Sequence, residues 1–271
     1  MSTDNPIRVG AVNYLNTKPL VYQLEEIAPN VRLSFDLPSR LADQLAANEL
    51  DVALIPSVEY FRNADAYRII SDACIGCRGP VWSVKLFCRV PADQIKTVAL
   101  DEGSRTSAAL VRILLKQKYG IEPQLLPLPI GDDMNQSTAD AMLLIGDRAM
   151  HTPLSSFAEI WDLGDIWCRW TELPFVFAMW VTRADFDCAG LAQSLNSARD
   201  LGQNALQSIS EIEAAKVALS VPECLSYLRD NLHFHLGPRE LAGLRLFYDY
   251  AAELDLAPKG LDWSEYDCET A

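Results

Sequence analysis

Short apolar runs alternate with amphipathic stretches along the first quarter of the chain. The β-branched run at 7–12 predicts a strand, and the stretch at 19–26, which begins with a proline, predicts a helix. A strand at 31–35 and a helix capped by Ser39 repeat this unit. The run at 51–55 lacks polar alternation, which is typical of a strand buried in a parallel sheet. Strands and helices alternating at this spacing indicate an α/β architecture.

The same alternation starts again in the middle of the chain. The segment at 97–100 predicts a strand, and 107–119 predicts a helix whose alanine, leucine and valine residues share one face. From Leu191 almost to the end, the spacing of apolar residues is helical. Further strands are predicted at 69–73, 84–88, 125–128, 141–145 and 175–181.

The length of the chain favours two lobes, because 271 residues exceed what one hydrophobic core usually organises. We expect lobe 1 to comprise residues 1–90 and 181–271, and lobe 2 to comprise residues 91–180. The chain would cross between them at 88–91 and return near 178–182, and two such linkers make a hinge. Ligands of parallel sheets bind beyond the carboxyl ends of the strands. The prediction is therefore a two-lobed α/β fold with a hinge and an inter-lobe cleft.

Four loops that follow predicted strands are expected to face this cleft. Asparagine amides in the first loop can bond ligand hydroxyl and carboxyl groups, although asparagine is also a common turn residue. The loop at 103–107 opens a helix, so its free N–H groups and the helix dipole can hold a carboxylate or phosphate. An ordinary helix N-cap by Ser104 or Thr106 is the alternative. The candidate substrate-binding residues of these loops are Asn13, Thr17, Ser57, Ser104, Arg105, Thr106, Ser107, Gly146 and Asp147.

Composition and charge narrow the class of partner. Hydrophobic residues make up 49% of the chain, enough for a real core, and the formal net charge is −14. Such a charge repels nucleic acid and anionic membrane surfaces, so neither is expected as a partner. Residues 1–91 carry nine basic and ten acidic side chains, whereas residues 181–271 carry seven and fifteen. A small anionic molecule can therefore still be received in the nearly neutral first third.

Targeting and cysteine patterns favour a cytoplasmic protein with reduced thiols. The polar N-terminus is not followed by an apolar stretch of signal-peptide length, and no apolar run is long enough to span a membrane. Seven cysteines are an odd number, which favours thiols over a disulfide framework. Cys74 and Cys77 have C-x-x-C spacing but no second pair, so no metal and no cofactor are expected. His151 is a candidate general base, but a hydrogen bond to a neighbouring loop explains it equally well.

Five strings occur in order between about residues 7 and 182. They lie at 9–20 (VGAVNYLNTKPL), 50–57 (LDVALIPS), 79–87 (GPVWSVKLF), 101–107 (DEGSRTS) and 144–147 (LIGD). Together they resemble the chorismate dehydratase family of menaquinone biosynthesis by the futalosine route, whereas the C-terminal helices carry little signature. The resemblance implies a type-II periplasmic-binding-protein-like fold used as an enzyme. It also implies conversion of chorismate to 3-[(1-carboxyvinyl)oxy]benzoate and water.

The resemblance assigns roles to particular side chains. It implies that Asn16 and Ser83 are the catalytic polar residues at the reacting ring, where they position the leaving hydroxyl and the enolpyruvyl group. The residues at 104–107, including Arg105, would hold a carboxylate from lobe 2. Loss of water makes the ring aromatic, so orientation of the substrate and exclusion of bulk water matter more than a strong protein acid. A substrate carboxylate acting as the proton acceptor is a hypothesis.

Two other functions stay open. The related naphthoate synthase of the same pathway shares the fold, and His151 would be its only candidate base. A non-catalytic solute-binding or sensory protein is the third possibility, because hinged folds more often bind than react. Incubation with chorismate separates the three functions, and the sequence leaves the oligomeric state open.

Overall fold

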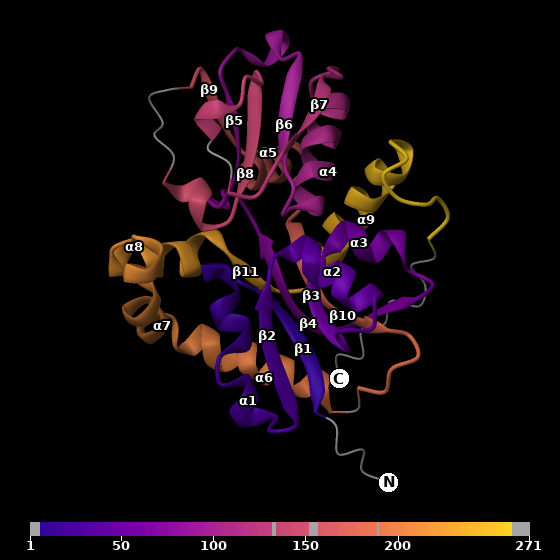
Figure 1. The fold of residues 1–271 in the computed structure, drawn as a ribbon, viewed down its shortest axis with the longest axis vertical. Helices are drawn as coiled ribbons and strands as arrows, with labels where there is room; N and C mark the ends of the chain where they lie inside the picture. Colours follow the sequence, from indigo (N-terminus) through magenta and orange to yellow (C-terminus); the bar gives the residue numbers. More distant parts are fainter. Residues whose placement is uncertain (1–5, 132–133, 152–156, 189, 262–271) are drawn as a thin grey trace.

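Two mixed sheets organise the chain in the computed structural model, which describes residues 6–131, 134–151, 157–188 and 190–261. Figure 1 shows the five-stranded sheet stacked above the six-stranded one along the long axis of the molecule. We call the six-stranded sheet with its helices lobe 1, and the five-stranded sheet with its helices lobe 2. The strand order of lobe 1 is β11 (His233–His235), β4 (Tyr67–Cys77), β10 (Phe175–Arg183), β3 (Val52–Pro56), β1 (Ile7–Val12), β2 (Val31–Asp36). The order of lobe 2 is β7 (Gln124–Leu128), β6 (Thr97–Asp101), β8 (Ala141–Ile145), β5 (Val84–Cys88), β9 (Glu159–Asp162).

Helices join these strands and form most of the C-terminal third. In the first half they are η1 (Leu15–Val21), α1 (Leu24–Ile27), α2 (Pro38–Ala46), α3 (Ser57–Arg62), η2 (Ala92–Gln94), α4 (Arg105–Ile113) and the π-helical η3 (Leu114–Lys118). Later come η4 (Met134–Gln136), η5 (Asp147–Met150), α5 (Leu163–Thr171), α6 (Leu191–Asn204), α7 (Leu206–Glu213), η7 (Ala214–Val217), α8 (Val221–Ser226), the π-helical η8 (Tyr227–Asn231) and α9 (Pro238–Glu253). None of the helices within the described ranges is long and apolar enough to cross a membrane.

The strand predictions follow from burial. All five residues of β3 are buried, which is why its sequence shows no polar alternation. β1 pairs in parallel with β2 and β3, and β6 pairs in parallel with β7 and β8. Each lobe therefore gathers the carboxyl ends of three strands at one edge, as the alternating pattern predicts. The short strands β9 and β11 were not expected; β11 lies in a region whose apolar spacing is helical.

The helix predicted at 19–26 is wrong in its bounds. A 3-10 helix, η1, already begins at Leu15 and contains Pro19. It ends before Gln23, whose left-handed backbone (φ 54°) separates it from the short α1. Four of its residues, among them Leu15 and Leu20, are buried, so packing against the core sets the bounds of this 3-10 helix. Consequently Asn16 lies on the 3-10 helix itself and not in a loop ahead of it.

The expected crossings between the lobes are each one strand too late. β5 belongs to the sheet of lobe 2 and β10 to the sheet of lobe 1. The chain therefore passes to lobe 2 through residues 78–83 and returns through α5 and the residues up to 174. Both strands are almost entirely buried, so their apolar sequences do not reveal which sheet they join. The crossing at 78–83 places Ser83 at the junction of the two lobes.

Candidate active site

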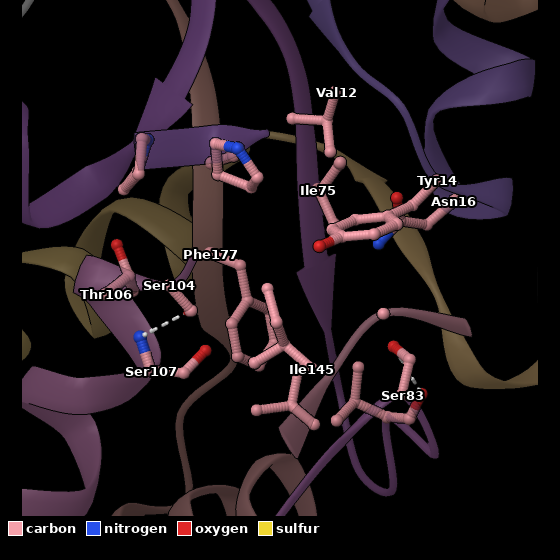
Figure 2. Close-up of a pocket in the computed structure, with 16 residues that line it drawn as sticks. Val12, Tyr14, Asn16, Ile75, Ser83, Ser104, Thr106, Ser107, Ile145 and Phe177 are labelled. Carbon is pink, nitrogen blue, oxygen red and sulfur yellow. Dashed lines mark hydrogen bonds between the residues drawn. The ribbon is translucent and has the colours of Figure 1, made fainter. Parts of the chain in front are cut away.

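A pocket lies between the lobes at the carboxyl ends of the strands. Lobe 1 contributes residues from the ends of β1 and β3, and lobe 2 contributes the start of α4 and the end of β8. Figure 2 shows the hydroxyl groups of α4 on one side and Asn16 and Ser83 on the other, with Phe177 and Ile145 between them. We call Ser104, Thr106 and Ser107 the α4 wall. Asn16 and Ser83 form the Asn16–Ser83 wall.

The α4 wall is built by the first turn of a helix. Ser104 is the N-cap, because its Oγ accepts a hydrogen bond of 3.2 Å from the Ser107 amide. The N-cap expected as an alternative is thus present, and the helix N-terminus still faces the pocket with the side chains of Ser104, Thr106 and Ser107. A helix N-terminus lined by hydroxyl groups favours an anionic ligand group.

Arg105, which the sequence predicts to bind a substrate carboxylate, does not line this pocket. Its guanidinium reaches lobe 1, with Nη2 2.8 Å from Oδ1 of Asp43 on α2 and Nη1 3.2 Å from Oε2 of Glu59 on α3. Burial lowers the pKa of Arg105, but the two carboxylates outweigh burial and raise it overall. Arg105 is the first residue of α4 in lobe 2, so its two ion pairs link lobe 2 to lobe 1.

Four other predicted binding residues lie outside the pocket lining. Asn13 is exposed. Thr17 and Ser57 are fully buried: Thr17 Oγ1 donates to Asn16 Oδ1 at 3.4 Å, and Ser57 Oγ donates to the Val176 carbonyl at 2.8 Å. Asp147 accepts a hydrogen bond of 3.3 Å from the Leu15 amide. These three groups hold the segments that carry the lining residues, whereas Gly146 does line the pocket.

The Asn16–Ser83 wall is backed by a tyrosine that the sequence did not single out. Tyr227 in η8 donates from its hydroxyl to Ser83 Oγ at 2.8 Å. Burial strongly raises the pKa of Tyr227, and the hydrogen bond with Ser83 and the nearby Asn16 amide oppose that rise. The phenol therefore stays protonated. Tyr227 lies 144 residues from Ser83 in a helical stretch, where an aromatic residue is typical of core packing, so no sequence signal identifies it.

Comparison with known proteins defines the family. Residues 7–253 match the family model described as menaquinone biosynthesis. The chain belongs to the menaquinone biosynthesis family. A chorismate dehydratase of Thermus thermophilus is 31% identical over 270 residues, covering 93% of this chain and 97% of the relative.

Solved structures agree on the fold. Protein AF1704 of Archaeoglobus fulgidus superposes with a TM-score of 0.76 at 15% identity, covering 93% of this chain and 98% of its own. The alkanesulfonate-binding protein SsuA of Xanthomonas axonopodis pv. citri, bound to MOPS, superposes with a TM-score of 0.72 at 15% identity over 96% of both chains. This member of the menaquinone biosynthesis family thus has the two-lobed periplasmic-binding-protein-like fold that the sequence predicts.

Tyr14 closes the pocket of this family member from lobe 1. Its ring packs against Gly146, where an added Cβ would lie 2.7 Å from Tyr14 Cε1. Gly146 also has a backbone (φ 68°, ψ −157°) that other residues rarely adopt. Burial, together with the nearby charge of Asp101, raises the pKa of Tyr14 to about 12. The predicted loops at 13–17 and 146–147 therefore do meet, through the Tyr14 ring and through the hydrogen bond from the Leu15 amide to Asp147.

Two carboxylates, that of the buried Asp101 and that of the half-buried Asp162, fix the loops around the pocket. Asp101 accepts hydrogen bonds from the amides of Gly103 at 2.9 Å and Ile145 at 3.3 Å, and it pairs with Arg148. Asp162 accepts from the amides of Val81 at 2.9 Å and Trp82 at 2.6 Å, which holds the segment carrying Ser83. Burial raises the pKa of Asp162 in spite of these bonds. Both carboxylates support the site without lining it.

The remaining candidates lie away from the pocket lining. His151 is exposed, and its Nε2 is 2.7 Å from the Val217 carbonyl, so the hydrogen bond expected as an alternative is present. Cys74 and Cys77 are buried free thiols, and burial raises the pKa of Cys74. In the ranges that the structure describes, no group of three or more His, Cys, Asp or Glu side chains is arranged to hold a metal ion.

Proposed function

We propose that this protein is a chorismate dehydratase, a hydro-lyase of the futalosine route that converts chorismate to 3-[(1-carboxyvinyl)oxy]benzoate and water. The observation that carries the proposal is the Asn16–Ser83 wall. The two side chains that the resemblance assigns to the reacting ring line one pocket, and Ser83 accepts a hydrogen bond from Tyr227. The activity named for the Thermus thermophilus relative, 31% identical over 93% of this chain, supports the same reaction.

The reaction needs two bonds broken on adjacent ring carbons. The C3–H bond breaks and its electron pair forms the third double bond of the ring. Hydroxide leaves from C4, and the proton from C3 combines with it to make the released water. The gain in aromaticity drives the reaction, so the protein has to orient the substrate, favour the departing hydroxide and exclude competing solvent.

The lining of the pocket favours a proton acceptor supplied by the substrate. None of the described lining residues is Asp, Glu, His or Lys. Tyr14 is held protonated at neutral pH, because burial and Asp101 raise its pKa to about 12. The enolpyruvyl carboxylate is attached at C3, so it is the base nearest to the proton that must leave. In this account the protein holds that carboxylate close to C3–H rather than supplying a base of its own.

The two walls then have separate tasks. The α4 wall receives a carboxylate of the chorismate dianion at the positive end of the helix. The Asn16–Ser83 wall contacts the hydroxyl and enolpyruvyl groups at C4 and C3. Apolar side chains such as Phe177 and Ile145 pack against the ring between them. Contacts between the lobes, including those of Arg105, keep bulk water out.

The geometry does not favour the naphthoate synthase alternative. His151, the expected base of that enzyme, is exposed and bonded to the Val217 carbonyl outside the pocket lining. The solute-binding alternative predicts tight binding of an anion without turnover. A cytoplasmic location stays a prediction from the sequence.

Chromatography of chorismate incubated with the purified protein tests the proposal. We expect chorismate to be replaced by one aromatic product with the mass of chorismate less one water. The matched control is the same reaction with the Asn16→Ala/Ser83→Ala double variant, which should leave chorismate unchanged. Bound chorismate recovered intact from the wild-type protein would contradict the proposal and favour a binding protein.

A further inference from the structure

Tyr227 lies where three distant parts of the chain meet. Its side chain is 1% exposed and contacts Ser83 from the crossing segment and Asn16 from η1. The Trp82 ring packs edge-on against it, with ring centroids 5.7 Å apart. Asn231, at the end of the same π-helical segment, donates from Nδ2 to the Pro80 carbonyl at 2.9 Å. The segment that carries Tyr227 is thus fastened on both sides to the segment that carries Ser83.

The hydrogens of this cluster can be assigned by counting donors. Tyr227 has one hydroxyl hydrogen and gives it to Ser83 Oγ. Asn16 lies near enough to the phenol to affect its pKa, and its Oδ1 accepts from Thr17 Oγ1 at 3.4 Å. The hydrogen bond of the Tyr227 hydroxyl therefore runs toward Ser83.

The hydroxyl hydrogen of Ser83 has only a weak acceptor within the protein. Since Ser83 Oγ accepts from Tyr227, its own hydrogen cannot point back to the tyrosine. The acceptor it has is the Val81 carbonyl, 3.4 Å away and at the long limit for an O–H donor. Ser83 also lines the pocket. The hydrogen is therefore available to an oxygen atom of a bound ligand, at the cost of one weak bond.

We propose that Tyr227 is a positioning residue for the dehydration: it fixes Ser83 as a hydrogen-bond donor toward the hydroxyl group that leaves C4. The inference rests on the proposed function. Without the tyrosine hydroxyl, the Ser83 hydrogen rotates among several acceptors and points at the substrate in only part of the molecules. Tyr227 itself does not touch the substrate, because it is buried behind Ser83 and is absent from the pocket lining.

A double-mutant cycle on the kinetics of chorismate turnover tests this role. Tyr227→Phe keeps the ring and removes only the hydroxyl group. We expect kcat to fall about 10- to 100-fold, less than in Ser83→Ala because the Ser83 hydroxyl remains, with KM changed less than about threefold. In a Ser83→Ala background the same change should cost less than about threefold in kcat, because its target is already absent.

Tyr250→Phe is the matched control, since Tyr250 lies in α9, where its ring stacks on Trp170 of α5 outside the site. It should keep the wild-type kcat. An unchanged kcat in Tyr227→Phe would overturn the inference. An equal loss with and without Ser83, or a rise in KM at constant kcat, would do the same, because each shows that Tyr227 acts on folding or binding. Absence of turnover by the wild-type protein would instead overturn the proposed function, and this inference with it.

Discussion

The two walls of the pocket are built in different ways. The α4 wall comes from one turn of helix, in which Ser104 caps the Ser107 amide three residues away. The Asn16–Ser83 wall needs η1, the crossing between the lobes and the C-terminal η8, and its key bond spans 144 residues. The proposed binding of an anion would thus be a local property of the chain. The proposed alignment of Asn16 and Ser83 on the departing hydroxide would depend on the assembled fold.

This difference predicts its largest effect on the Asn16–Ser83 wall. Ser83→Ala or Asn16→Ala should lower kcat at least about 100-fold, because each removes a donor that favours charge developing in the transition state. KM should change little. Asn13→Ala is a matched control three residues from Asn16, and its exposed side chain should leave steady-state kinetics within about twofold. Equal losses of kcat in Asn13→Ala and Asn16→Ala would show that activity depends on the conformation of this segment and not on the Asn16 side chain.

Gly146→Ala should be the next most damaging change, because Gly146 lines the pocket and packs against the Tyr14 ring. The added Cβ would lie 2.7 Å from the Tyr14 ring, and the backbone there (φ 68°) is strained for alanine. We expect the free energy of unfolding to fall by about 1–3 kcal/mol. Displacement of Tyr14 should lower kcat/KM about 30-fold, as small misplacements at active sites do. Chemical denaturation and steady-state kinetics measure the two effects.

Gly120→Ala is the control that separates the effect of backbone strain from the effect of a clash with Tyr14. Gly120 has a similar φ of 70°, but an added Cβ there meets no atom within 4 Å. This variant should lose stability and keep its activity. If Gly120→Ala lowered kcat/KM as much as Gly146→Ala, general destabilisation and not contact with Tyr14 would explain the loss.

The α4 wall should respond in KM. Ser107→Ala removes one hydroxyl that faces the ligand carboxylate, so KM should rise about tenfold with kcat nearly unchanged, as expected for one hydrogen bond to a charged group. Ser104→Ala should raise KM and also lower the free energy of unfolding by about 1 kcal/mol, because it removes the N-cap. A fall in kcat at constant KM in Ser107→Ala would place the chemistry on this wall.

Arg105→Ala should have the smallest effect of the set. Its partners are carboxylates of lobe 1, and Asp43 is 64% exposed, so the link is worth about 1 kcal/mol at most. Weakened closure should raise KM about threefold to fivefold. Asp43→Asn/Glu59→Gln should reproduce that rise. A KM increase near 100-fold in Arg105→Ala alone would instead identify Arg105 as a carboxylate ligand.

Local patterns explain which parts of this structure were predictable. The run at 51–55 and the cap at Ser104 depend on neighbouring residues, so strand β3 and the α4 wall follow from the sequence. The sequence does not show which sheet β5 and β10 join, because both strands are apolar and nearly fully buried. The ion pairs of Arg105 with Asp43 and Glu59 do not follow from the sequence either, because charge alone does not show which side of a helix turn faces the pocket.

The Asn16–Ser83 wall shows the same limit more sharply. Asn16 and Ser83 were found through a family resemblance, which their residue types alone do not supply. Tyr227 was missed because its hydroxyl acquires a role only when η8 packs against the crossing segment. Interactions across such sequence distances have no local pattern, so they appear only in the folded chain.

We propose that the Asn16–Ser83 wall carries the chemistry and that the α4 wall binds the anion. Steady-state kinetics of Ser83→Ala and Ser107→Ala with chorismate, measured side by side, test this division. We expect a fall in kcat of at least about 100-fold at nearly constant KM for Ser83→Ala, and a KM rise of about tenfold at nearly constant kcat for Ser107→Ala. A fall in kcat in both variants, or a rise in KM in both, would contradict this division.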